Sequence, residues 1–159
     1  MPVIRRLTLS DEAATATLAA ALAPHLRAGD ALLLDGPLGA GKTSFARALI
    51  RQLAGAAIEV PSPTFNLVLT YDIPAGMLWH FDLYRVADPR ELDELGLEDA
   101  LAEGISLIEW PDRLGTAAPP DALTLRLAPA AGTGTARQAE LAGDTAWAAR
   151  LAALDLPHD

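Results

Sequence analysis

The chain has 159 residues and carries 12 basic against 21 acidic side chains, a net charge of −9 at pH 7. This length suits one core with one functional site, so we expect a single domain over residues 1–159. A hydrophobic content of 51% excludes a disordered chain. The negative charge argues against direct binding of a nucleic-acid backbone, because that binding depends on Lys and Arg displacing counterions.

Cysteine is absent, which excludes disulfides, thiolate metal sites and thiol nucleophiles. No uncharged apolar run approaches the roughly 20 residues that a membrane span needs, so we expect no membrane association. Asp11 and Glu12 stand where a signal peptide should become apolar, ahead of an Ala-rich run. We therefore expect a cytoplasmic protein.

The first part of the chain predicts a strand, a helix and a second, buried strand. Residues 3–9 form the first strand, and Ser10 is expected to cap a helix that runs to about Arg27. The apolar run Ala31–Asp35 is typical of a strand buried on both faces of a parallel sheet. A glycine-rich turn and helical sequence over Thr43–Leu53 follow.

The second part predicts further strands and helices. Two prolines exclude regular structure over Val60–Phe65, and the short turn Pro74-Ala75-Gly76 favours an antiparallel hairpin. The remaining elements are strands over 67–73, 77–81, 105–108, 123–127 and 137–141, two short helices over 88–103, a loop over 116–120, and a helix over 145–154. This order predicts an α/β fold with a mixed, mainly parallel central sheet.

One segment carries a phosphate-binding motif. Its sequence is Gly36-Pro37-Leu38-Gly39-Ala40-Gly41-Lys42-Thr43, which satisfies G-x-x-x-x-G-K-[ST] between a predicted strand and a predicted helix. Such a loop turns backbone N–H groups onto phosphates, its Lys reaches the β- and γ-phosphates, and its Thr hydroxyl can ligate Mg²⁺. The chain has a single lysine, Lys42, and places it here. We expect residues 36–43, with Ser44, to bind a nucleotide.

Two acidic residues follow predicted buried strands, Asp82 and Glu109. An open α/β sheet presents such carboxylates at the crevice where the phosphates lie, so we hypothesise that both share Mg²⁺ with Thr43, directly or through water. The alternative is a strand-end cap or a solvated acid. Thr64, in the proline loop, is placed for a switch that senses the γ-phosphate, or else it bonds locally in a rigid turn.

Other side chains near these acids have less specific patterns. His80 lies on a buried strand, where a histidine is usually a satisfied core residue rather than a catalyst. Arg85 is better placed to meet a phosphate or an acidic partner. Trp110 either stacks on a ring or a partner, or packs inside the protein.

The choice among nucleotide-dependent proteins rests on what the chain lacks. A Ras-like GTPase needs a second lysine in its N-K-x-D motif, and an ABC-type ATPase needs a signature segment and more length. A small-molecule kinase remains an alternative, although the arginines after Arg85 are widely scattered. A second alternative is a nucleotide-gated binding module, because no arginine finger is evident.

Four further motifs make the chain resemble one family. They are Pro61-Ser62-Pro63-Thr64-Phe65, His80-Phe81-Asp82-Leu83-Tyr84-Arg85, Glu94-Leu95-Gly96-Leu97 and Ile108-Glu109-Trp110-Pro111. With the phosphate loop, they stand in the order and spacing of the TsaE (YjeE) family, and the resemblance covers essentially the whole chain. It implies a three-layer P-loop ATPase that is required for threonylcarbamoylation of adenosine 37 in tRNAs reading ANN codons.

The resemblance also implies partners and residue roles. The partners are TsaB and TsaD; TsaD transfers the threonylcarbamoyl group, ATP hydrolysis resets or drives the complex, and tRNA is reached only through it. The resemblance implies the following site residues: Lys42 for phosphate, Thr43 and Glu109 for Mg²⁺, Asp82 for the metal or the attacking water, Thr64 for the switch, and Ser10 and Arg137 near the adenine or ribose. The acidic stretch Asp88–Glu103 is a candidate docking face for a basic partner, or a solvated helical face.

Overall fold

The computed structural model describes residues 2–63, 66–130, 134, 136–154 and 156. Within these residues one sheet has the strand order β1-β7-β6-β2-β5-β4-β3. The strands are β1 (Val3–Leu9), β2 (Ala31–Asp35), β3 (Val68–Ile73), β4 (Gly76–Asp82), β5 (Ile105–Glu109), β6 (Leu123–Pro129) and β7 (Arg137–Ala142). The helices are α1 (Glu12–Leu22), α2 (Lys42–Ala54), α3 (Glu91–Glu94), α4 (Leu97–Glu103) and α5 (Thr145–Arg150), with 3₁₀ turns η1 (Ala23–His25) and η2 (Pro111–Ala117).

The centre of the sheet is parallel and its outer pairings are antiparallel. Strands β6, β2, β5 and β4 run in the same direction, whereas β1, β7 and β3 pair antiparallel with their neighbours. Asp82 ends β4 opposite Glu109, which ends β5. The carboxyl ends of three parallel strands therefore meet at one edge, beside the start of α2.

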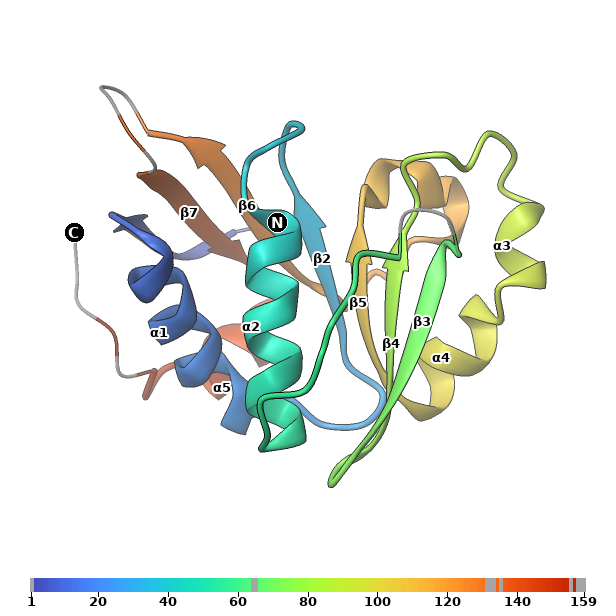
Figure 1. The fold of residues 1–159 in the computed structure, drawn as a ribbon, viewed down its shortest axis with the longest axis horizontal. Coiled ribbons are helices and arrows are strands. Elements are labelled where there is room, and N and C mark those ends of the chain that lie inside the picture. The colour runs from blue at the N-terminus through green and yellow to red at the C-terminus, as the bar shows by residue number, and fades with distance from the viewer. Residues whose placement is uncertain (1, 64–65, 131–133, 135, 155, 157–159) are drawn as a thin grey trace.

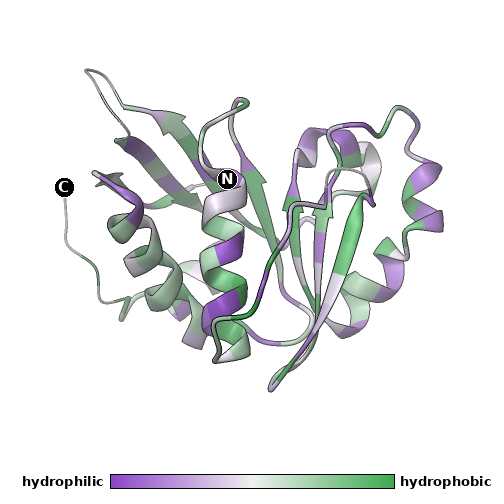
Figure 2. Ribbon diagram, viewed as in Figure 1, coloured by the Kyte–Doolittle hydropathy of each residue, from purple (hydrophilic) through white to green (hydrophobic). Residues whose placement is uncertain are grey.

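Helices cover both faces of the sheet and give three layers. Figure 1 shows α1, α2 and α5 together on the left of the view and α3 and α4 on the right. Side chains alternate between the faces: Leu32 and Leu34 join the core beneath α1, α2 and α5, whereas Leu33 packs against the core beneath α3 and α4. Hydrophobic residues fill the central strands in Figure 2. The expected three-layer α/β fold with a mixed, centrally parallel sheet is confirmed.

The structure corrects the ends of three predicted elements. Asp11, not Ser10, caps α1, because its side chain accepts a 2.8 Å hydrogen bond from the Ala14 backbone N–H. The α-helix ends at Leu22 rather than Arg27, since Pro24 lacks an N–H and the chain continues as the 3₁₀ turn η1. The last helix ends at Arg150 rather than at residue 154. Part of the loop expected over 116–120 belongs to η2.

In the part of the chain that the structure describes, no helix is both long enough and apolar enough to cross a membrane.

Candidate functional site

The turn between β2 and α2 has a backbone that requires glycine at two positions. Gly36 has φ +150°, and a Cβ on it would lie 2.3 Å from the Leu127 carbonyl oxygen. Gly41 has φ +101° and is the residue before α2, so its left-handed backbone aims the chain into the helix. The motif glycines therefore permit both the close approach to β6 and the entry into α2.

Lys42 lies folded inside this turn with only 4% of its surface exposed. Its Nζ donates to the Gly36 carbonyl oxygen and lies 3.3 Å from the centroid of the Trp110 ring. Burial lowers the pKa of Lys42 from 10.5, while nearby carboxylates, Glu109 first among them, act in the opposite direction. The ammonium thus lies at the end of β5, among the carboxylates of the strand ends.

Strand alternation directs three polar side chains to the face that α2 covers. In β4 the side chains of Leu78, His80 and Asp82 share one face, and in β5 Glu109 shares the face of Leu107; Leu78 and Leu107 belong to the core beneath α2. All three polar residues are buried. A period of two along adjacent strands therefore brings an imidazole and two carboxylates to the first turn of α2.

The two oxygens of Glu109 each have a partner. Thr43 Oγ1 donates to Glu109 Oε1 at 2.8 Å, and His80 Nε2 lies 2.7 Å from Glu109 Oε2. The neighbouring Asp82 accepts a 3.1 Å hydrogen bond at Oδ1 from the Tyr84 backbone N–H. Glu109 therefore links the phosphate loop to β4. His80, expected to be a satisfied core residue, has this carboxylate as a partner at Nε2 but has none at Nδ1 among the described residues.

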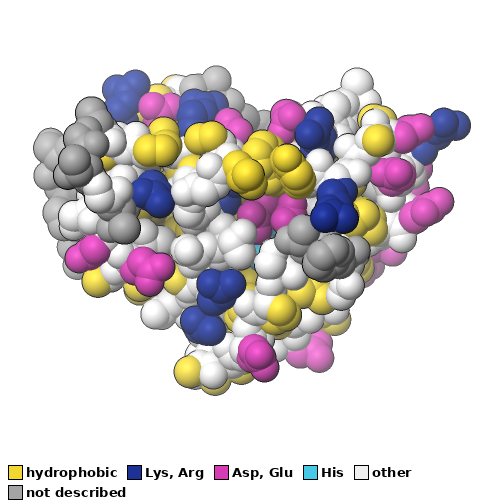
Figure 3. Space-filling model, turned by 45° about the horizontal axis from the view of Figure 1, so that its top comes forward, with side chains coloured by type: hydrophobic (Ala, Val, Ile, Leu, Met, Phe, Trp, Pro, Cys, Tyr) yellow, Lys and Arg dark blue, Asp and Glu magenta, His cyan; other side chains and the backbone are white. Residues whose placement is uncertain are grey.

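These residues line one pocket. Its walls are formed by the phosphate loop and by the two strand-end acids, and the lining residues are Leu38, Gly39, Gly41, Lys42, Thr43, Ser44, Ser62, Asp82, Glu109 and Trp110. Figure 3, in which the top of the view of Figure 1 is turned forward, shows acidic side chains near the centre with a group of hydrophobic side chains beside them. The site residues expected from Leu38 to Ser44, apart from Ala40, therefore share a cavity with both expected acids.

The donor set of the pocket suits a small hard cation. Thr43 supplies a hydroxyl and Asp82 and Glu109 supply carboxylates, the oxygen ligands that Mg²⁺ prefers. Among the described residues, no three His, Asp or Glu side chains are grouped closely enough to hold a metal ion by themselves. Mg²⁺ characteristically keeps several waters and binds through one or two carboxylates plus substrate phosphates, and this donor set fits that pattern.

Of the other expected site residues, Arg137 contacts the phosphate loop without lining the pocket. Arg137 Nε donates to the Ala40 carbonyl oxygen at 3.0 Å, and its NH2 group donates to that of Gly39 at 3.2 Å. Its backbone pairs with Leu9, so the exposed Ser10 follows directly at the same end of β1. The sequence did not predict the hydrogen bonds from Arg137 to the phosphate loop, because 97 residues separate Arg137 from Ala40. Thr64 lies outside the described residues.

Trp110 lines the pocket, and Tyr84 packs against it. Trp110 has a left-handed backbone with φ +60°, which turns its ring over the Lys42 ammonium. The Tyr84 ring packs against Trp110 with centroids 4.8 Å apart. Arg85 follows Tyr84 on the exposed surface. Trp110 thus packs within the site and also borders the pocket.

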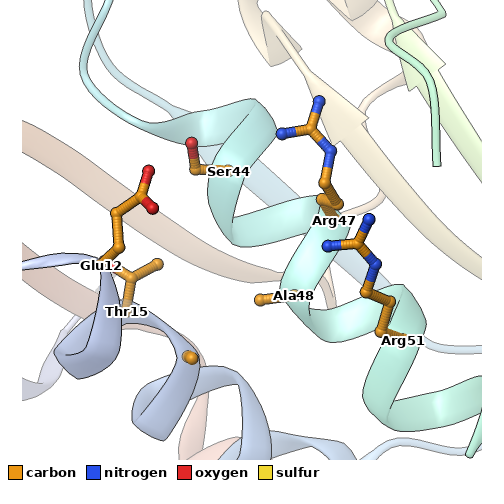
Figure 4. Close-up of a pocket in the computed structure, with 7 residues that line it drawn as sticks. Glu12, Thr15, Ser44, Arg47, Ala48 and Arg51 are labelled. Carbon is orange, nitrogen blue, oxygen red and sulfur yellow. The ribbon is translucent and has the colours of Figure 1, made fainter. Parts of the chain in front are cut away.

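A second groove lies between α1 and α2 (Figure 4). Arg47 Nε donates to the Val60 carbonyl oxygen and Arg51 Nε donates to that of Ile58, each at 3.0 Å. These two arginines therefore hold the segment that leads into Pro61. Sequence reasoning did not identify this contact, although the spacing of four residues puts both arginines on one face of α2.

Comparison with known proteins agrees with this geometry. Residues 9–139 match the family model described as "Threonylcarbamoyl adenosine biosynthesis protein TsaE". A protein of Rickettsia felis, named tRNA threonylcarbamoyladenosine biosynthesis protein TsaE, is 45% identical over 106 residues, which cover 67% of this chain and 62% of that protein. A protein of the same name from Aquifex aeolicus is 38% identical over 114 residues, 71% of this chain and 81% of that protein.

A solved structure extends the similarity to the whole fold. The crystal structure of Bacillus subtilis YdiB superposes with a TM-score of 0.75 at 25% identity, covering 97% of this chain and 96% of that one. The match to the first curated relative covers about three fifths of its length. Because the family model spans most of the chain and the relatives exceed 30% identity, the chain belongs to the TsaE family.

Proposed function

We propose that this chain is a Mg²⁺-dependent subunit that binds and hydrolyses ATP during threonylcarbamoylation of adenosine 37 in tRNAs that read ANN codons. The relatives named for tRNA threonylcarbamoyladenosine biosynthesis support the pathway. We further propose one domain over residues 1–159 and a cytoplasmic location. The single sheet of the described residues is consistent with one domain, and the absence of cysteine is consistent with the cytoplasm.

One observation carries the ATPase part of the proposal: Thr43 donates a 2.8 Å hydrogen bond to Glu109 Oε1 inside the pocket that Lys42 also lines. The bond joins the hydroxyl of the phosphate loop to the carboxylate at the end of a neighbouring parallel strand. A P-loop NTPase uses that pairing of hydroxyl and strand-end acid to hold Mg²⁺. A nucleotide in this pocket would therefore lie against both groups.

Each residue of the pocket has a distinct proposed role. Lys42 and the backbone N–H groups of the loop bind the β- and γ-phosphates, and the N-terminus of α2 adds its partial positive charge. Thr43 and Glu109 would hold the cation, and Asp82 supports it or orients the attacking water. When bound, Mg²⁺ would neutralise charge that develops on the phosphate oxygens. Thr64 is the proposed switch residue.

The remaining residues of the proposed nucleotide site lie around this centre. The proposed nucleotide-binding loop also includes three residues that do not line the pocket, Gly36, Pro37 and Ala40. Ser44, which follows Thr43 on α2, is the last residue of the proposed phosphate site. Ser10 and Arg137 are proposed to lie near the adenine or ribose; the position of Ser10 beside the register partner of Arg137 supports this.

The proposed partners are TsaB and TsaD, with tRNA bound through their complex. A net charge of −9 supports an indirect contact with tRNA, since a chain that binds a nucleic-acid backbone by itself needs an excess of basic residues. The acidic stretch Asp88–Glu103 is exposed over much of its length and supplies a surface for a basic partner.

One observation also favours a nucleotide-gated binding module as a second candidate. Among the described residues that line the pocket, Lys42 is the single cation. Efficient hydrolysis generally uses an arginine finger, supplied in cis or by a partner. A chain whose hydrolysis requires a cationic side chain from a partner would bind ATP by itself and hydrolyse it slowly until the partner binds.

Reconstitution of tRNA modification tests the proposal. TsaB, TsaD, the enzyme that makes the threonylcarbamoyl adenylate, and an ANN-reading tRNA are combined with the parent chain, Lys42→Ala or Glu109→Gln. We expect repeated modification with the parent and loss of it with both variants. Modification that proceeds equally with Lys42→Ala would contradict a role for ATP at this site.

A further inference from the structure

Among the described residues, one buried titratable side chain has no part in the roles proposed above. His80 is fully buried on β4, and its Nε2 lies 2.7 Å from Oε2 of Glu109, which is itself 2% exposed. Glu109 is one of the acids at the centre of the pocket, while His80 lies beneath it on the same face of the sheet. A buried carboxylate is costly unless it is hydrogen-bonded, so this contact affects how Glu109 is held.

The surroundings of the imidazole indicate which nitrogen carries its hydrogen. His80 Nδ1 is buried and has no hydrogen-bond partner among the described residues. A hydrogen on Nδ1 would be a buried donor without an acceptor, whereas a hydrogen on Nε2 is donated to the carboxylate. The geometry therefore favours a hydrogen on Nε2, which is donated to Glu109 Oε2.

The contact with His80 orients the Glu109 carboxylate, and this carboxylate in turn orients the Thr43 hydroxyl. With Oε2 held by His80, Oε1 is fixed where it accepts the Thr43 hydroxyl hydrogen at 2.8 Å. A threonine hydroxyl has one hydrogen and two lone pairs, and this contact uses the hydrogen. Both lone pairs of Oγ1 are then left for the pocket, where a cation would need them.

We propose that His80 is a positioning residue, which holds the Glu109 carboxylate so that it and the Thr43 hydroxyl present their lone pairs to a divalent cation. The proposal rests on the proposed function, because it takes the cation site at Thr43 and Glu109 as given. Groups that orient a metal ligand typically change metal affinity ten- to a hundredfold when they are removed. His80 is thus expected to affect the response to Mg²⁺ while contacting neither nucleotide nor cation.

Three substitutions separate positioning from packing. His80→Gln keeps a donor near the place of Nε2, His80→Asn keeps an amide but moves its donor near the place of Nδ1, and His80→Leu removes the donor. The matched control is Ser106→Ala, which deletes a fully buried polar group on the opposite face of β5. Each full-length variant is titrated with Mg²⁺ in the presence of a fluorescent ADP analogue, and its affinity for the analogue is also measured in EDTA.

We expect His80→Leu and His80→Asn to raise the Mg²⁺ midpoint by about tenfold or more, at the lower end of the effect of removing such a group. His80→Gln and Ser106→Ala should stay within about threefold of the parent, and affinity in EDTA should be unchanged in all four. An equal response of the Gln and Asn variants would overturn the proposal. So would an unchanged midpoint in His80→Leu alongside a raised midpoint in Glu109→Gln.

Failure of the proposed function gives a different pattern. If Glu109→Gln also leaves the Mg²⁺ midpoint unchanged, the cation site itself is wrong and both proposals fall. If His80→Leu does not fold, the comparison of the Gln and Asn variants decides the question alone.

An NMR spectrum of the histidine ring nitrogens adds a test that needs no mutant activity. The chain has three histidines, and the signal missing from His80→Gln assigns His80. We expect the parent to show a hydrogen on Nε2. A neutral ring with its hydrogen on Nδ1 would overturn the proposal, because Nε2 would then have none to donate to Glu109.

Discussion

The hydroxyl of Thr43 donates a 2.8 Å hydrogen bond to Oε1 of Glu109, which ties the first turn of α2 to the end of β5. Residues joined in this way are expected to act as a unit when the cation binds. We predict that Thr43→Ala and Glu109→Gln each weaken Mg²⁺-dependent nucleotide binding about tenfold, and that the double variant is little worse than either. Such coupling is typical of residues in one network.

A double-mutant cycle by fluorescence titration measures this coupling. The control cycle pairs Glu109→Gln with Ser44→Ala, one residue further along α2, where we expect the two effects to multiply. If the effects of Thr43→Ala and Glu109→Gln on nucleotide affinity also multiply, the hydrogen bond does not link the two residues in function.

The buried Lys42 makes the stability of the protein depend on pH. Burial lowers the pKa of Lys42 from 10.5, although Glu109 and other carboxylates oppose the shift. Between the lowered pKa and 10.5 the unfolded chain binds more protons than the folded chain, so the stabilising effect of raising the pH is confined to that window. As pH rises through this window, the free energy of unfolding of the parent should increase relative to that of Lys42→Met.

Urea unfolding of both proteins at a series of pH values tests this prediction, and the difference between the curves isolates Lys42 from other titrating groups. A free energy of unfolding that falls in the parent, relative to Lys42→Met, as pH rises would contradict the assigned direction.

Gly36 and Gly39 allow two effects of glycine to be separated. A Cβ at Gly36 would meet the Leu127 carbonyl oxygen at 2.3 Å, whereas one at Gly39 would meet no atom within 4 Å, and both residues have positive φ. We expect Gly39→Ala to cost about 1–2 kcal/mol from backbone strain alone. Gly36→Ala should cost more than about 2 kcal/mol, because the backbone of β6 must move. Equal losses in chemical denaturation would show that the close approach is unimportant.

Arg47 is predicted to hold the segment that precedes the proline loop. Its Nε donates to the carbonyl oxygen of Val60, a buried residue, whereas the exposed Arg51 makes the equivalent bond to the half-buried Ile58. We expect Arg47→Ala to cost about 1–2 kcal/mol of stability and to speed amide exchange in residues 58–60. Arg51→Ala should change stability by less than about 0.5 kcal/mol. Identical exchange rates in parent and Arg47→Ala would contradict this role.

The sequence was sufficient to predict the fold and the phosphate loop because these depend on local patterns. The apolar run ending at Asp35, the glycines after it and the helical sequence from Thr43 specify strand, turn and helix within one short stretch. The hairpin between β3 and β4 follows from the turn residues Pro74-Ala75-Gly76 in the same way.

Contacts between distant segments that no motif marks could not be predicted. The bond from Arg137 to the carbonyl of Ala40 spans 97 residues, and the pairing of His80 with Glu109 depends on the register of β4 against β5. The preference for Ser10 over Asp11 as a cap failed for a local reason, since both residue types are good caps and the backbone chose between them. Thr64 stays a prediction.

ATP turnover by the purified chain is the most direct test of the central claim, which is that Lys42, Thr43 and Glu109 form a nucleotide-hydrolysing site that partners complete. Turnover is measured with Mg²⁺, alone and with TsaB and TsaD, and with Lys42→Ala as the blank. We predict low turnover by the chain alone, a rise with both partners, and no turnover in the variant. Partners that neither bind nor change the rate, or turnover that survives Lys42→Ala, would contradict it.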